Sequence, residues 1–152
     1  MDGLQKVLPV LLPLAIAWAE FCSQEGARTG QVLSEGGARI ARQVGVAHPE
    51  LVRIKVVDAM PAPQDPRLRL AAQQVGLLLE NMAGLTLGST IFLRRGYEAS
   101  VRLLSHECCH VAQYEQAGSI ERYLTSYLPQ LLAHGYQKAP DEADARAHEI
   151  QA

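Results

Sequence analysis

The chain has few cysteines, a net charge close to zero and no apolar run of bilayer length. Its three cysteines are Cys22, Cys108 and Cys109, an odd number with two of them adjacent. This pattern excludes the disulfide framework of a small secreted domain and favours a reducing compartment. The 14 Lys and Arg residues against 16 Asp and Glu give a net charge of −2, so nothing predicts a nucleic-acid partner held by charge. We therefore expect a cytoplasmic protein that binds no nucleic acid.

The longest apolar run covers residues 7–19. Its 13 residues are fewer than the roughly 20 that a bilayer span needs, so we expect no stable membrane span. A helix that is apolar all round usually lies in a core, which makes a buried helix the first interpretation. A signal for export within residues 1–19 and a segment on a membrane surface stay open, because the run follows Lys6 and ends in small residues. Two prolines and the acidic Asp2 fit a signal poorly.

The composition is that of one ordinary folded domain. The chain has 152 residues, of which 48% are hydrophobic and 20% charged, and no repeat or linker divides it. Apolar residues with helical spacing predict a helical N-terminal scaffold over residues 1–50, with a break at 26–30 before a second helix at 31–44.

A small sheet is expected within residues 51–93. Residues 51–57 alternate between apolar and charged side chains, which predicts a half-buried strand. A proline-rich loop and a short helix at 68–74 follow. Residues 84–93 are β-branched and apolar, which predicts a second strand with a bulge or bend at Gly88.

Three helices are expected within residues 100–152. Gly118 and Ser119 have the residue types that end one helix and begin the next, so we predict helices over 101–117 and 120–134. Pro140 suits the first position of a terminal helix over 140–151. The prediction as a whole is a single α+β domain that is mostly helical and has a small β-sheet.

The most informative string runs from Ser105 to His110 and contains the pattern His-Glu-x-x-His within a predicted helix. Residues four apart share a helix face, so the imidazoles of His106 and His110 can converge on one metal ion. Glu107 would then lie beside the metal, where its carboxylate can accept a proton from the water that the metal activates. The spacing predicts one Zn²⁺ ion, with Glu107 as the general base of a hydrolysis.

A third protein ligand is expected, because a catalytic zinc usually has three of them and one open position. We choose Glu142, because the 32 positions from His110 let the chain turn back and present a second helix. Asp144 is the nearest rival, although it points to a different helix face. His134 or His148 as the third ligand, or no third ligand, remain alternatives. Glu142 and Asp144 also carry a charge that is favourable near a helix N-terminus without any metal.

These motifs resemble the gluzincin type of zincin metallopeptidase. They are most similar to small bacterial metallopeptidase-like proteins of unknown function that combine a T-x-G-x-x-I strand, an L-x-H-E-x-x-H-x-x-Q helix and a late P-x-E-x-[DE]-A element. The resemblance spans residues 83–146 and rests on Thr86, Gly88, Ile91, Leu104, His106, Glu107, His110, Gln113, Pro140, Glu142, Asp144 and Ala145. It implies that His106, His110 and Glu142 bind zinc, that Glu107 is the general base, and that the motif lies on a zincin-like active-site helix.

Hydrolysis of an amide also needs a donor that stabilises the oxyanion of the tetrahedral intermediate. Tyr136 is our choice for this catalytic role; His134 is the other candidate near the Gly135 break, and Tyr127 lies behind them. The tyrosines also fit an ordinary packing stripe. The adjacent Cys108 and Cys109 are expected to be buried or partly buried thiols rather than ligands.

The sequence thus predicts a zinc-dependent metallopeptidase that hydrolyses a peptide bond of a peptide or protein substrate. An extended peptide can add to the predicted strand at 85–93 if that strand lies at a sheet edge. The main alternative is a non-catalytic zinc- or peptide-binding module in a larger assembly. A third is a helical scaffold in which the motif is accidental. The sequence leaves the oligomeric state open.

Overall fold

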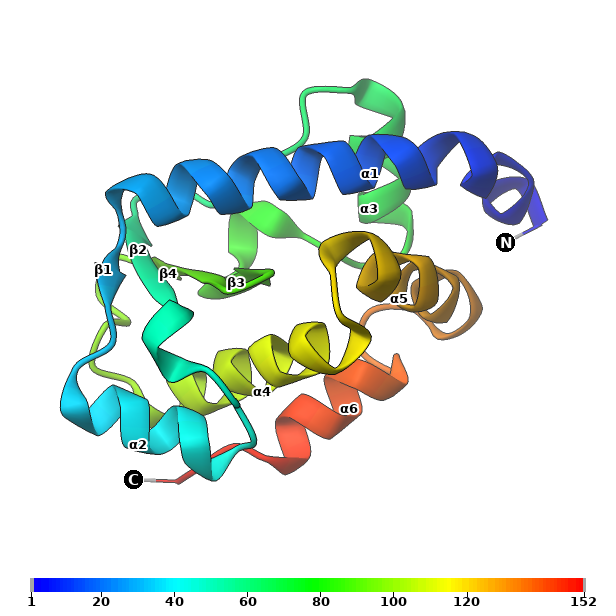
Figure 1. Ribbon diagram of the computed structural model, residues 1–152. Coiled ribbons are helices and arrows are strands. Elements are labelled where there is room, and N and C mark those ends of the chain that lie inside the picture. Colours follow the sequence, from blue (N-terminus) through cyan, green and yellow to red (C-terminus); the bar gives the residue numbers. More distant parts are fainter. Residues whose placement is uncertain (1, 152) are drawn as a thin grey trace.

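A four-stranded sheet lies between helices in the computed structural model, which describes residues 2–151 (Figure 1). The strands are β1 (Gln31–Val32), β2 (Arg53–Val57), β3 (Gly84–Leu87) and β4 (Thr90–Arg94). Their order in the sheet is β1-β2-β4-β3; β2 and β4 are parallel, and the other two pairs are antiparallel. The helical majority and the small sheet confirm the predicted α+β class.

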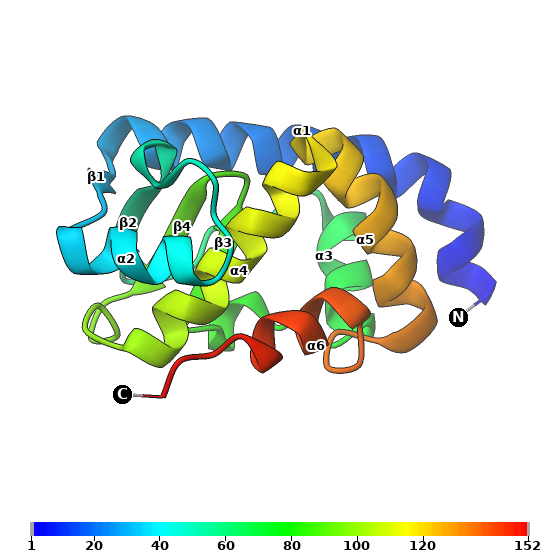
Figure 2. The ribbon, with the colours of Figure 1, turned by 60° about the horizontal axis from the view of Figure 1, so that its bottom comes forward.

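Helices cover both faces of this sheet. α1 (Asp2–Thr29) runs across one face, and α2 (Glu35–Gln43) and α4 (Val101–Ala117) lie on the other (Figure 1). α5 (Ile120–His134) and α3 (Pro66–Gln74) pack against α1, and α6 (Pro140–Ala147) lies alongside α4 (Figure 2). Short 3-10 helices occur at Pro49–Leu51 and Leu79–Asn81. The site described below lies where α4, α6 and β3 meet.

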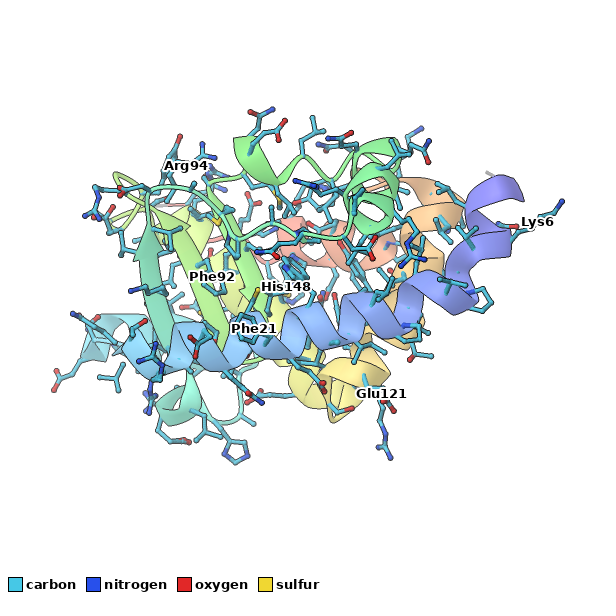
Figure 3. All side chains as sticks on the ribbon, turned by 90° about the horizontal axis from the view of Figure 1, so that it is seen from above. Lys6, Phe21, Phe92, Arg94, Glu121 and His148 are labelled. Atoms are coloured by element: carbon cyan, nitrogen blue, oxygen red, sulfur yellow. The ribbon has the colours of Figure 1, made fainter. Side chains whose placement is uncertain are left out.

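α1 is not the all-round buried helix that its apolar sequence predicts. It buries one stripe with helical spacing, whereas Val10 is 51% exposed and Phe21 on the same helix is 65% exposed (Figure 3). Among the described residues this is the one helix that is long and apolar enough to cross a membrane, by length and composition. Within its most apolar stretch of 18 residues, 17% of the residues are buried. The helix is longer than the apolar run, and its length and composition do not decide whether it spans a membrane, so the expectation of no span stays a prediction. Location stays a prediction.

The expected break at residues 26–30 is wrong, because α1 continues to Thr29. Gly26 lies where α1 packs tightly against β4. A Cβ atom there would lie 2.7 Å from Cζ of Phe92 and 2.8 Å from Cγ2 of Thr90, so only glycine fits without a shift. Thr90 also donates its hydroxyl to the carbonyl oxygen of Ser23 at 2.8 Å. The glycine serves helix–sheet packing and not a turn.

The second helix also begins later than predicted. Gln31 pairs with Ile54, and Val32 with Arg53, so these residues form β1 instead of a helical turn. α2 begins only after Ser34, whose hydroxyl accepts a hydrogen bond from the backbone N–H of Gly37 at 3.0 Å. An edge partner for β2 thus replaces the helical turn predicted from local spacing.

Residues 84–93 form a hairpin, not the single bent strand that we predicted. β3 and β4 pair antiparallel with Thr86 opposite Ile91, and Gly88 has a φ of 66° in the turn between them. A positive φ is readily adopted only by glycine, which explains a tight turn at this position. β3 has β4 as its only neighbour in the sheet, so within the described chain β3 is an edge strand.

The C-terminal helices begin and end close to their predicted positions, except for the last one. α6 ends at Ala147 and not at residue 151. Beyond it, the backbone N–H of Ile150 donates to the hydroxyl of Ser105 at 2.8 Å, which ties the last described residues to α4. This attachment decides where Glu149 lies.

Candidate metal centre

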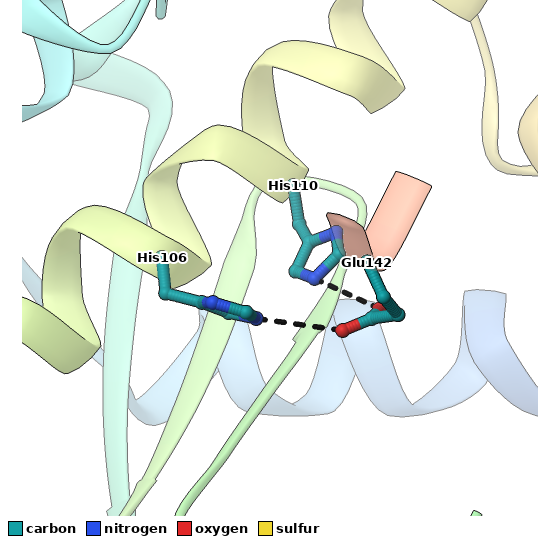
Figure 4. A group of neighbouring side chains, drawn as sticks. All are labelled: His106, His110 and Glu142. Carbon is teal, nitrogen blue, oxygen red and sulfur yellow. Dashed lines mark ion pairs between the residues drawn. The ribbon is translucent and has the colours of Figure 1, made fainter. Parts of the chain in front are cut away.

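α4 carries the His-Glu-x-x-His motif between two well-defined ends. The hydroxyl of Ser100 accepts from the backbone N–H of Leu103 at 3.1 Å, and Gly118 ends the helix with a φ of 99°. The apolar face of the helix packs with β4 and α2, as its spacing predicts. His106 and His110 project from another side, toward α6 (Figure 4).

His106, His110 and Glu142 converge, as the prediction of three ligands requires (Figure 4). Nε2 of His110 lies 3.0 Å from Oε2 of Glu142, and Nε2 of His106 lies 3.4 Å from Oε1 of the same carboxylate. One ligand atom from each residue lies within 4.8 Å of the other two. Two nitrogens and one carboxylate oxygen are donors that zinc accepts, so the donor set fits this ion.

Glu142 and the two histidines interact strongly through charge and hydrogen bonds. Burial alone would raise the pKa of Glu142, but hydrogen bonds with His106 and His110 hold that pKa well below its usual range. Burial alone would lower the pKa of His110, but its hydrogen bond with Glu142 and the charge of Glu142 raise that pKa to about 9. The carboxylate therefore attracts positive charge to the space that it shares with the two imidazoles.

Each imidazole is also held through its second ring nitrogen. Nδ1 of His106 lies 2.8 Å from Oε2 of Glu149, and Nδ1 of His110 lies 2.8 Å from Oε1 of Gln113. Both oxygens are acceptors, so a neutral ring keeps its proton on Nδ1 and presents the lone pair of Nε2 toward Glu142. Histidines that bind metals are commonly oriented in this way.

Neither of the two supporting residues, Gln113 and Glu149, was assigned a role from the sequence. Gln113 entered only as part of the family resemblance, and Glu149 was not considered. No local signal distinguishes Glu149 from a surface acid, since its partner His106 lies far away in the sequence. The rival ligand Asp144 lies outside the His-His-Glu group. Its Oδ2 accepts from Nε2 of Gln113 at 2.9 Å, so it contacts His110 only through Gln113.

Glu107 points toward the edge strand β3. Thr86 donates its hydroxyl to Oε1 of Glu107 at 2.7 Å, and burial raises the pKa of this carboxyl. A Cβ atom on Gly84 would lie 2.9 Å from Oε2, so the glycine provides the room for the carboxylate. Gly84 and Thr86 are two residues apart and face the same side of the strand. The hairpin therefore positions the predicted base.

The three residues considered as oxyanion donors occupy different places. His134 is exposed, whereas Tyr127 and Tyr136 line a cavity together with Glu142. Tyr127 donates its hydroxyl to Oε2 of Glu142 at 3.1 Å, so it positions a predicted ligand. Burial, and then the charge of Glu142, raise the pKa of Tyr136, so its hydroxyl keeps its proton and can donate.

A cavity of about 140 Å³ adjoins the group. Side chains of α1, α3, β3 and α5 form most of its wall, which is largely apolar, and Glu107, His110 and Glu142 are among its few polar members. An apolar cavity of roughly 150 Å³ can hold a benzene molecule, so this volume suits one large apolar side chain.

Cys108 and Cys109 are buried, as expected. Burial raises the pKa of each thiol to about 12, so both keep their protons at neutral pH. Neither belongs to the group of His106, His110 and Glu142.

Comparison with known proteins identifies no relative. No family model matches the chain, and no match is found among curated proteins or solved structures. The resemblance to gluzincins therefore rests on the motifs and stays a prediction.

Proposed function

We propose that the protein is a zinc-dependent metallopeptidase. One observation carries the proposal: the carboxylate of Glu142 lies between the Nε2 atoms of His106 and His110, beside Glu107 and an apolar cavity. Three protein donors next to a cavity match the ligand number of catalytic zinc sites, which keep a further position open.

The residues of this chain have separate tasks in the proposed reaction. His106, His110 and Glu142 would hold the ion. A bound zinc ion supplies Lewis acidity, which lowers the pKa of water to about 7 and polarises a carbonyl group. Glu107 accepts a proton from the attacking water and passes it to the leaving amine nitrogen. The hydroxyl of Tyr136 is the proposed donor to the oxyanion.

A peptide suits this site better than a compact substrate. β3 is the edge strand of the described sheet, and edge strands can pair with an extended peptide. Gly84, Leu85, Thr86 and Leu87 of this strand also line the cavity. A peptide paired with β3 can therefore place an apolar side chain in the cavity while its backbone lies near Glu107.

Metal analysis and a single substitution test the proposal. We expect about one zinc ion per purified chain at the His-His-Glu site, and cleavage within a fluorogenic peptide library rich in Leu and Phe. Glu107→Gln should retain zinc but lower kcat by about 10²–10⁴-fold, because it cannot transfer the proton. The control is Glu121→Gln, at a position that projects outward at the start of α5 (Figure 3).

The other outcomes lead to different conclusions. Undiminished cleavage by Glu107→Gln would exclude this residue as the base. Zinc without cleavage of any library member would favour the non-catalytic zinc- or peptide-binding module. A chain that binds no zinc would favour the scaffold with an accidental motif.

A further inference from the structure

A second group of metal-binding side chains lies beside the first. It consists of Cys109 on α4, Asp144 on α6 and His148, which closes α6. One ligand atom of each residue lies within 4.8 Å of the other two. The group shares no residue with His106, His110 and Glu142. The contact between α4 and α6 therefore presents two sets of donors.

The geometry of this group leaves it open to solvent. Asp144 and His148 are one helical turn apart, and their side chains are 49% and 47% exposed. Nδ1 of His148 donates to the backbone carbonyl oxygen of Asp144 at 2.8 Å and lies 3.3 Å from Oδ1 of the same residue. Sγ of Cys109 lies 3.5 Å from Oδ2 of Asp144. Cys109 itself is only 3% exposed, so the thiol forms the inner side of the group. An ion can approach from the side of the two exposed residues.

We propose that Cys109, Asp144 and His148 form a second metal site, for Zn²⁺ or another divalent ion that accepts thiolate. Sulfur, imidazole nitrogen and carboxylate oxygen are the three donor types that zinc uses, and tetrahedral coordination leaves one position for water. On binding, the Cys109 thiol, which is otherwise protonated at neutral pH, releases its proton to solvent, and the sulfur donates its electron pair to the ion. The neutral ring of His148 binds through the nitrogen that carries no proton. No other reactant is needed.

Asp144 couples this second site to the first. Its Oδ2 lies near Sγ of Cys109 and also accepts from Nε2 of Gln113 at 2.9 Å. Oε1 of Gln113 in turn lies 2.8 Å from Nδ1 of His110. An ion that takes Asp144 as a ligand competes with Gln113 for this carboxylate and so loosens the support of His110. Given the proposed function, excess zinc therefore inhibits the peptidase.

Cobalt(II) can distinguish the two sites. Only a site with a thiolate ligand shows an intense sulfur-to-cobalt charge-transfer band in the near ultraviolet. We expect the wild-type chain to bind two Co²⁺ ions and to show this band. Cys109→Ala should lose the band and bind one ion, whereas the matched control Cys108→Ala should keep it. His148→Ala, at an exposed position, should shift the band to higher cobalt concentration.

Two results would overturn the second site. One is a folded wild-type chain that binds cobalt without the band, and the other is a band that persists in Cys109→Ala. His106→Ala separates the two proposals, because it should lose the first ion and keep the band. Loss of the band in His106→Ala as well would assign the thiolate to the first site. Absence of peptide cleavage would contradict only the proposed function and its inhibition.

Discussion

The proton positions on His106 and His110 follow from the acceptors behind them. The amide of Gln113 has a defined orientation, because its Nε2 donates to the carbonyl oxygen of Asp141 and to Oδ2 of Asp144, both at 2.9 Å. Its Oε1 therefore faces His110 as an acceptor. Glu149 offers His106 a carboxylate instead. Each ring is held with Nε2 toward Glu142.

Removal of the acceptor behind His106 should weaken metal binding. We expect Glu149→Ala to lower zinc affinity by about 10–100-fold, because His106 loses the group that orients it and makes it more basic. Glu149→Gln should have a smaller effect, since its amide oxygen can still accept. Competition with a fluorescent chelator measures the affinity, and Glu121→Ala is the control. Wild-type affinity in Glu149→Ala would show that this contact does not support the site.

Both ends of α4 are defined by single residues. Ser100 begins the helix and Gly118 ends it, and the chain then reverses into α5. These ends were predictable, because caps and left-handed C-terminal residues depend on a few adjacent residues. The hairpin of β3 and β4 was not, because an apolar stretch with one glycine also fits a single bent strand.

The left-handed conformation of Gly118 at the end of α4 can be tested by substitution. Gly118→Ala should lower the free energy of unfolding by about 1–2 kcal/mol, because a Cβ atom is disfavoured at its φ of 99°. Urea denaturation measures the change. Gly36→Ala, within α2 and with its nearest contact at 3.8 Å, should instead raise the stability by up to about 1 kcal/mol. Equal stability of the two variants would contradict this account of the turn.

In the whole molecule, the candidate centre connects α4 to the C-terminal region. Glu142 lies on α6, and Glu149 and Ile150 also contact α4, through His106 and Ser105. α1 and α5 lie beyond this contact and form much of the cavity wall. Metal binding should therefore stabilise the folded chain as a unit, because the unfolded chain does not hold these donors together.

Zinc should raise the melting temperature of the protein. An ion at about 100 times its dissociation constant adds about 2.7 kcal/mol of stability. For a chain of this size, that corresponds to a shift of about 5–11 °C. Differential scanning calorimetry with zinc and with a chelator measures the shift. The variant His106→Ala should show a smaller shift, because only the second proposed site can then bind zinc, and an equal shift in this variant would place the stabilising ion elsewhere.

The sequence alone determined the parts of the site that follow from local geometry. His106, Glu107 and His110 lie on one helix, so their relative directions follow from helical periodicity. The prediction of Glu142 needed more, because spacing in the chain allowed Asp144, His134 and His148 as well. The mistakes about α1 and β1 have a related cause: Gly26 and Gln31 are placed by contacts with Phe92 and Ile54.

Only the tertiary structure decided which distant side chains meet the motif. Thr86 on β3, Glu142 on α6 and Glu149 beyond it come from separate segments, and packing of the sheet and of α6 against α4 brings them together. The same packing places Cys109 beside Asp144 and His148. Direction along one helix is a local property of the chain, but contact between segments depends on how the whole core packs.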